Sequence, residues 1–132
     1  ARQRAAAIDI PVEMIALELG QIQAADASFD SIVCTFTLCT IPDAVAALRE
    51  MRRVLKPRGK LLFSEHGLAP DASVVRWQNR LTPLWKPLAG GCHLNRDIPA
   101  LLEAGGFTIG QLETSYLKGP RPMTWVYRGW AN

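Results

Sequence analysis

The sequence lacks both a high charge content and a long apolar run, and its composition is typical of a globular domain. Charged residues make up only 20% of its 132 residues, and the hydrophobic share is 48%. This composition is too apolar for a disordered chain and indicates one domain with a modest core. No apolar run has the length of a bilayer-spanning helix and no signal peptide is visible, so we expect no membrane span.

Cysteine and histidine are also scarce. The three cysteines, Cys34, Cys39 and Cys92, include no CxxC pair, so the sequence indicates neither a disulfide framework nor a zinc site. His93 follows Cys92 directly, but no further ligands are suitably spaced, and we predict no metal site. Free thiols within apolar runs fit a reducing compartment, so we expect a cytoplasmic protein.

A strong charge of either sign is missing too, because the net charge is only +3. The densest basic cluster, residues 49–58, falls on a predicted helix and its exit turn. Such clusters more often form a solvated helix face than a nucleic-acid footprint. We therefore expect no nucleic-acid partner.

The clearest predicted element is the segment from Phe29 to Ile41, where apolar and β-prone residues occupy both faces. This pattern predicts a central parallel strand covered by helices on both sides. Asp43 would cap the next helix. Its apolar residues recur at helical spacing: Val45, Leu48, Met51 and Leu55. A turn at 56–59 ends that helix, and residues 60–64 form a second strand after a right-handed crossover.

The remaining segments carry weaker signals. Residues 12–19 fit a strand or a short helix, and the prolines and glycines of 71–91 predict a helix broken into a loop. Asn95 or Asp97 would cap a helix that ends at Gly105-Gly106. Two late strands, Phe107 to Leu117 and Met123 to Arg128, would form an antiparallel hairpin.

Several of these segments, in this order, resemble class I S-adenosylmethionine-dependent methyltransferases. Residues 27–33 (ASFDSIV) are similar to the entry into the family's strand four, and residues 48–62 (LREMRRVLKPRGKLL) to its following helix, turn and strand five. Gly105-Gly106-Phe107 resembles the helix end before strand six. The similarity is to the ubiquinone/menaquinone-biosynthesis type, the methyltransferase type 11 group. Residues 65–67 (EHG) and 90–96 (GGCHLNR) resemble its thiol methyltransferase-like branch.

The resemblance implies an α/β, Rossmann-like fold with a partial sheet. Its strands would follow the order 4-5-7-6 with strand seven antiparallel, the first half would be missing, and residues 1–132 would form the C-terminal portion of one methyltransferase domain. The implied cofactor, S-adenosylmethionine, would lie over the carboxyl ends of the strands. The ten glycines include no GxGxxG loop, so we expect weak or absent cofactor binding by this chain.

For the cofactor side, the resemblance places Thr35, Phe36, Thr37 and Leu38 beside the methionyl and sulfonium part. It places Glu18 near the adenine amino group. Packing inside a buried strand is the alternative for Phe36 and Leu38, and an ordinary surface position is the alternative for Glu18.

For the acceptor side, the catalytic candidates are His66 and Cys39. His66 directly follows the predicted second strand, and a histidine near neutral pKa suits a general base, although many such histidines are structural. Four further residues are candidates for binding the acceptor: Trp77, His93, Asn95 and Arg96. Arg96 would hold an anionic group or pair with a neighbouring carboxylate, and Trp77 would line an apolar pocket or pack in the core.

Two functional hypotheses follow. In the first, the intact protein transfers a methyl group to a small-molecule acceptor. In the second, the chain is a non-catalytic, truncated methyltransferase-like module that forms a homodimer. The reason is that a half sheet would leave strand four as an unpaired edge, which strand exchange of residues 10–19 in a dimer would cover.

Overall fold

The computed structural model describes residues 17–18 and 21–132. The prediction for residues 12–19 and the suggested exchange of residues 10–19 therefore lie largely outside the described residues. Within them, β1 (Leu17–Glu18) and β2 (Gln21–Ile22) form a short antiparallel pair. The main sheet contains β3 (Phe29–Thr35), β4 (Leu55–His66), β5 (Ile109–Tyr116) and β6 (Trp125–Ala131). The helices are α2 (Ala44–Val54), α3 (Ala72–Leu88) and α4 (Ile98–Ala104), with a 3-10 turn η1 (Arg121–Met123).

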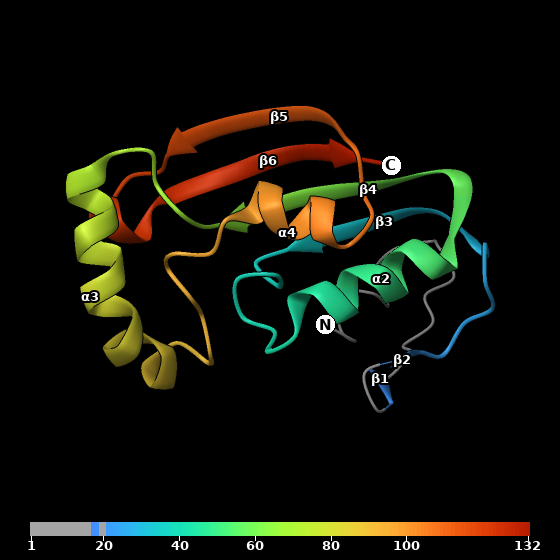
Figure 1. Ribbon diagram of the computed structural model, residues 1–132, viewed down its shortest axis with the longest axis horizontal. Helices are drawn as coiled ribbons and strands as arrows, with labels where there is room; N and C mark the ends of the chain where they lie inside the picture. Colours follow the sequence, from blue (N-terminus) through green and yellow to red (C-terminus); the bar gives the residue numbers. More distant parts are fainter. Residues whose placement is uncertain (1–16, 19–20) are drawn as a thin grey trace, which may run out of the picture.

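The main sheet has the predicted strand order. Its four strands run β3-β4-β6-β5, with β3 parallel to β4 and with β6 antiparallel to both neighbours (Figure 1). These strands correspond to the expected order 4-5-7-6 with strand seven antiparallel. The Rossmann-like, partial α/β sheet is thereby confirmed, and the late antiparallel hairpin with it.

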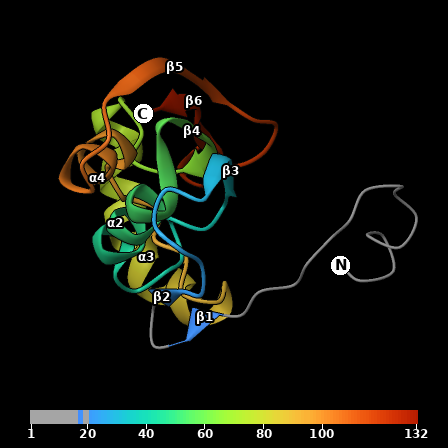
Figure 2. The ribbon, with the colours of Figure 1, turned by 90° about the vertical axis from the view of Figure 1, so that its right-hand side faces the viewer.

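Helices α2 and α4 lie on the same side of the sheet (Figure 2). The core between them and the sheet is apolar and includes Leu48, Leu61, Phe63, Ile98 and Leu102. Burying side chains of this size contributes about 2 kcal/mol each relative to exposure.

The opposite face of the sheet is open in the described part of the chain. There Val33 is 72% exposed and Leu62 is 42% exposed. Our expectation that helices cover this strand on both sides is therefore wrong for the described residues. An apolar pattern on both faces of a strand indicates that both faces can be buried. It does not show which helix or strand covers each face.

The connection between α2 and β4 differs in detail from the prediction. Asp43 caps α2 by accepting the N–H of Ala46 at 2.9 Å, as expected. The helix ends at Val54, and Leu55 already belongs to β4, where it is paired with Phe29. Residues 56–59 then form an irregularity, because Ser31 pairs with Lys60. The predicted turn is thus a bulge within one long strand.

Helix α3 is continuous, so the predicted break within residues 71–91 is wrong. Pro83 and Pro87 both lie inside the helix and are exposed to solvent. Water can therefore satisfy the carbonyl groups that lose their N–H partners. Figure 1 shows α3 beyond the carboxyl ends of β3 and β4, at the far end of the sheet from the α2–β4 connection.

The last elements follow the prediction closely. Asp97, rather than Asn95, caps α4 by accepting the N–H of Ala100 at 3.1 Å. The helix ends at Gly105, and Gly106 adopts a positive φ of 88°.

Candidate functional site

A buried carboxylate organises the carboxyl ends of β3 and β4. Glu65 is 0% exposed, and its Oε1 accepts the N–H of Thr37 at 2.8 Å and the thiol of Cys34 at 3.4 Å. Its Oε2 accepts the N–H of Cys39 at 3.2 Å. A buried carboxylate is tolerated when donors surround it in this way, so Glu65 fixes the path of the loop that follows β3.

A partly buried guanidinium holds the same loop from its other side. Arg96 donates to the carbonyl of Leu38, to that of Ile41 at 2.6 Å and to that of Pro42 at 3.2 Å. These bonds go to main-chain carbonyl groups, and the described residues show no pairing of Arg96 with Asp97 or Glu103. Binding of an anionic substrate group by Arg96 stays a prediction. The planar fork of Arg96 matches three carbonyl groups that the loop would otherwise leave without donors.

The loop between these two anchors contains the predicted cofactor residues. β3 ends at Thr35, so the strand is shorter than the predicted segment, which extends to Ile41. Phe36, directly after Thr35, has a positive φ of 49°. This backbone conformation is unfavourable for a non-glycine residue and is typical of sites where function fixes the main chain.

The side chains of this loop divide into exposed and buried ones. Phe36 is 53% exposed, and Thr35 beside it is exposed. Leu38 is 0% exposed and packs in the core, so its side chain does not face a ligand site. The packing alternative is therefore correct for Leu38 and wrong for Phe36. Glu18 lies in β1, and its side chain is outside the described part of the structure.

The catalytic candidates His66 and Cys39 meet around a third residue, Cys92. The Cys92 Sγ lies 3.8 Å from Nδ1 of His66. The N–H of His93 donates to the Cys39 carbonyl at 2.7 Å, which brings the main chain of Cys39 beside Cys92. The neighbouring Cys39 thiol and then His66 lower the pKa of Cys92. The neighbouring Cys92 thiol and burial raise the pKa of Cys39.

His66 has one ring nitrogen without a partner. The residue is 5% exposed, and its Nε2 is buried with no hydrogen-bond partner among the described residues. An unpaired buried polar atom costs about 1–3 kcal/mol, so it is commonly a position that a ligand or water satisfies.

The predicted acceptor-binding residues fall into two places. His93 and Asn95 line an open cavity of about 690 Å³ beside the end of α3, where Thr82 and Lys86 also contribute. Asn95 donates to Asn79 at 2.9 Å, and the His93 Nδ1 lies 3.2 Å from the Cys39 carbonyl oxygen. Trp77 lies elsewhere on α3 and is 55% exposed, so its predicted place in the core is wrong.

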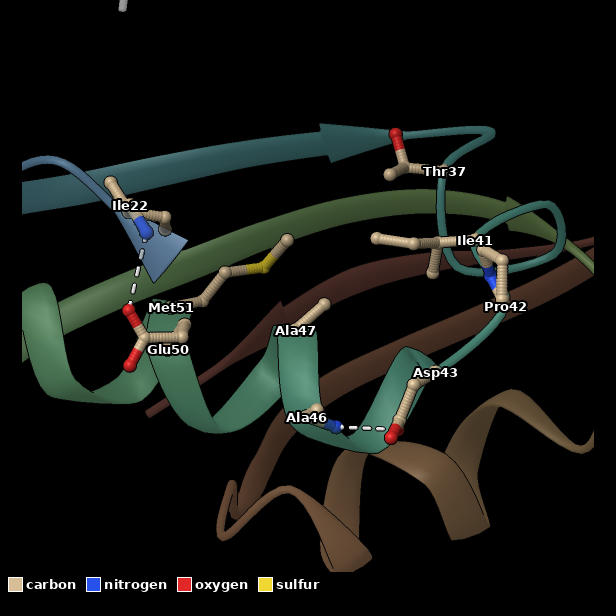
Figure 3. Close-up of a pocket in the computed structure, with 9 residues that line it drawn as sticks. All are labelled: Ile22, Thr37, Ile41, Pro42, Asp43, Ala46, Ala47, Glu50 and Met51. Carbon is tan, nitrogen blue, oxygen red and sulfur yellow. Dashed lines mark hydrogen bonds between the residues drawn. The ribbon is translucent and has the colours of Figure 1, made fainter. Parts of the chain in front are cut away.

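A second pocket lies between the loop and the start of α2 (Figure 3). It has a volume of about 290 Å³, and apolar side chains such as Ile41, Ala47 and Met51 form most of its wall. Thr37 stands at one end, and Ile22 donates its N–H to Glu50 at 3.2 Å at the other. The pocket thus brings the predicted cofactor residue Thr37 next to an apolar cavity.

Two features are absent from residues 17–18 and 21–132. No group of three or more potential metal ligands comes together there. No helix in this range is long and apolar enough to span a bilayer.

Comparisons with known proteins identify the family. The family model for a methyltransferase domain matches residues 1–63. The thiol S-methyltransferase TMT1B of Rattus norvegicus is 41% identical over 105 residues, which are 79% of this chain and 41% of that protein. The chain belongs to the class I S-adenosylmethionine-dependent methyltransferases. It spans about two fifths of the length of the curated relative it matches.

Solved structures support the methyltransferase fold. An S-adenosylmethionine-dependent methyltransferase from Mesorhizobium loti has a TM-score of 0.66 at 19% identity, over 99% of this chain and 74% of that one. The trans-methyltransferase CalH, solved with SAH, has a TM-score of 0.62 at 23% identity, over 98% of this chain and 38% of that one.

The sequence patterns did not indicate two residues of this cluster, Glu65 and Cys92, as functional. A signal for Glu65 was present, because a lone carboxylate ends the apolar strand that begins at Leu61. Such a residue is rarely buried unless donors surround it. Cys92 carried no comparable signal, because its contact with Cys39 joins segments that are distant in sequence.

Proposed function

We propose that the protein transfers a methyl group from S-adenosylmethionine to a small-molecule thiol. In this proposal the chain is the C-terminal portion of the methyltransferase domain and supplies the acceptor side of the site. The observation that carries the proposal is the unpaired, buried Nε2 of His66 at the carboxyl end of β4. The similarity to the thiol S-methyltransferase TMT1B supports the choice of acceptor.

The residues present fit one wall of a cofactor site. S-adenosylmethionine, when bound, supplies a methyl group carried by a sulfonium. Thr35 and Phe36 offer exposed side chains at the end of β3. The N–H groups of Thr37 and Cys39 already bind Glu65, so this loop offers side chains rather than amide donors to a cofactor. The remaining donors would have to come from residues outside this wall.

The proposed role of His66 is to accept the proton of the thiol. A thiol is a far weaker nucleophile than its thiolate, so deprotonation accelerates attack. On the other side of the ring, Nδ1 faces Cys92, which favours a tautomer with Nε2 free to accept. Burial also excludes water from this nitrogen, so the acceptor would be its main partner.

The experiment compares the protein with its His66→Gln variant, using labelled S-adenosylmethionine and 2-mercaptoethanol as acceptor. We expect kcat to fall by about 100-fold at pH 7. We also expect the variant to recover part of the loss at high pH, where the thiol ionises unaided. Glu113→Gln, on the exposed face of β5, is the matched control. A His66→Gln variant with the parent's rate and pH profile would exclude the base role.

A second candidate function is self-association. Two observations favour it. In the described sheet β3 pairs with β4 alone, so its other edge is unpaired there. Val33 on the same strand is 72% exposed. Sedimentation velocity would test it. We expect a homodimer that Val33→Lys dissociates and that Leu88→Lys, a change at an exposed residue of α3, leaves intact. A monomer at all concentrations would exclude this function.

The cytoplasmic location is part of the same proposal. Its support is that Cys34, Cys39 and Cys92 are all free thiols.

A further inference from the structure

Two of the three cysteines lie against each other although they are far apart in sequence. The N–H of His93 donates to the carbonyl of Cys39 at 2.7 Å. A Cβ atom added at Gly91 would lie 3.1 Å from the carbonyl oxygen of Thr40. The main chains on either side of Cys92 therefore touch those around Cys39. A disulfide requires this close approach of two main chains.

The two thiols differ in accessibility. Cys39 is 1% exposed, whereas Cys92 is half-buried. Gly91 and His93, the neighbours of Cys92, line the open cavity of about 690 Å³ beside α3. The segment that carries Cys92 therefore forms part of the cavity wall, and the half-buried Cys92 is the more accessible of the two thiols.

The surroundings also favour Cys92 as the nucleophile of the pair. Its Sγ lies 3.8 Å from Nδ1 of His66, and the neighbouring Cys39 thiol and then His66 lower the pKa of Cys92. A more accessible thiol of this kind beside a buried second thiol has the arrangement of an attacking and a resolving cysteine.

We propose that Cys39 and Cys92 form a thiol–disulfide exchange site whose substrate is a small-molecule disulfide. In the first step the Cys92 sulfur attacks one sulfur of the disulfide, its S–S bond breaks, and one thiol leaves. In the second step Cys39 attacks the Cys92 sulfur, the mixed disulfide breaks, and the second thiol leaves with the Cys39 proton. The two cysteines are oxidised to one disulfide, and the small disulfide is reduced to two thiols.

The test uses bis(2-hydroxyethyl) disulfide and the protein without any cofactor, so its result does not depend on methyl transfer. Intact mass and thiol titration follow the reaction, and peptide mapping locates the product. We expect two of the three thiols to disappear together and the mapped bond to join Cys39 to Cys92. Cys34→Ser is the matched control and should form the Cys39–Cys92 disulfide at the parent's rate.

Two variants separate the steps. Cys39→Ser should stop as a stable mixed disulfide on Cys92, and Cys92→Ser should react at least about tenfold more slowly. In the parent protein, limiting iodoacetamide should label Cys92 first, a measurement that needs no variant to fold. The proposal is overturned if the parent also stops at the mixed disulfide, if Cys92→Ser reacts at the parent's rate, or if iodoacetamide labels Cys34 first.

Discussion

The Oε1 atom of Glu65 accepts the backbone N–H of Thr37 at 2.8 Å and so ties the end of β4 to the loop after β3. The same carboxylate also binds the N–H of Cys39 at 3.2 Å. One side chain thus fixes two points of the loop that follows β3.

Removing the charge of Glu65 should therefore loosen this loop. In Glu65→Gln the new amide group must face at least one N–H donor, so a buried donor is left unpaired. We expect a loss of about 2 kcal/mol in the free energy of unfolding, measured by urea denaturation. Amide exchange of Thr37 and Cys39 should accelerate. Glu113→Gln, at an exposed position of β5, should change stability by less than about 0.5 kcal/mol. Equal effects of the two changes would contradict this role.

Arg96→Lys should destabilise the protein even though it keeps the positive charge. A lysine ammonium cannot span the carbonyl groups of Leu38, Ile41 and Pro42 at once. We expect a loss of about 2 kcal/mol by urea denaturation. Arg49→Lys on the exposed side of α2 provides the comparison. An Arg96→Lys protein as stable as the Arg49→Lys protein would show that the charge alone suffices.

Stability should fall at alkaline pH because of Cys34. Burial and then the nearby Glu65 charge raise the pKa of Cys34 to about 12. In the unfolded chain this thiol ionises near pH 8.5. The unfolded state therefore binds fewer protons than the native state between these values, and rising pH favours unfolding. The stabilisation is complete below about pH 8.5, and about 2 kcal/mol of it is lost by pH 10.

The Cys34→Ala variant isolates this contribution from those of other groups. The difference in unfolding free energy between parent and variant, measured in urea at pH 7.5 and at pH 10, should shrink by about the same 2 kcal/mol. A difference that stays constant with pH would show that Cys34 ionises equally in both states.

Gly129→Ala should be among the most damaging single methyl additions. Gly129 lies in β6, which is paired on both sides, and an added Cβ would meet the Gln111 carbonyl oxygen at 1.9 Å. Main chain must move to relieve this clash, and the expected cost is about 3 kcal/mol. The urea midpoint measures it, with Ser115→Ala on exposed β5 as the control. A midpoint within the range of that control would mean that β5 and β6 separate at little cost.

Sequence patterns predicted the parts of the fold that depend on local signals. The Asp43 and Asp97 caps, the glycine end of α4 and the strand order all follow from residue types at fixed spacing or from the family motifs. The continuity of α3 did not follow, because solvent exposure of Pro83 and Pro87 decides it, and exposure is a tertiary property.

The site was predictable only in part for the same reason. The position after the predicted second strand indicated His66, and Cys39 was a further candidate; in the structure Cys92 lies 3.8 Å from His66, and its neighbour His93 bonds the Cys39 carbonyl. The partners of Arg96 are carbonyl groups more than fifty positions away, and a sequence pattern does not record main-chain acceptors. A guanidinium that is suited to an anionic ligand is equally suited to main-chain carbonyl groups.

The loop between Glu65 and Arg96 has a consequence for ligand recognition. A carboxylate on one side and a guanidinium on the other fix its main chain through contacts internal to the protein. The entropy of ordering this segment is therefore lost during folding and not when a ligand arrives. The loop can therefore present Phe36 and Thr35 on a main chain that is already fixed before a ligand binds. The free energy of ligand binding then includes no further entropy cost for ordering this main chain.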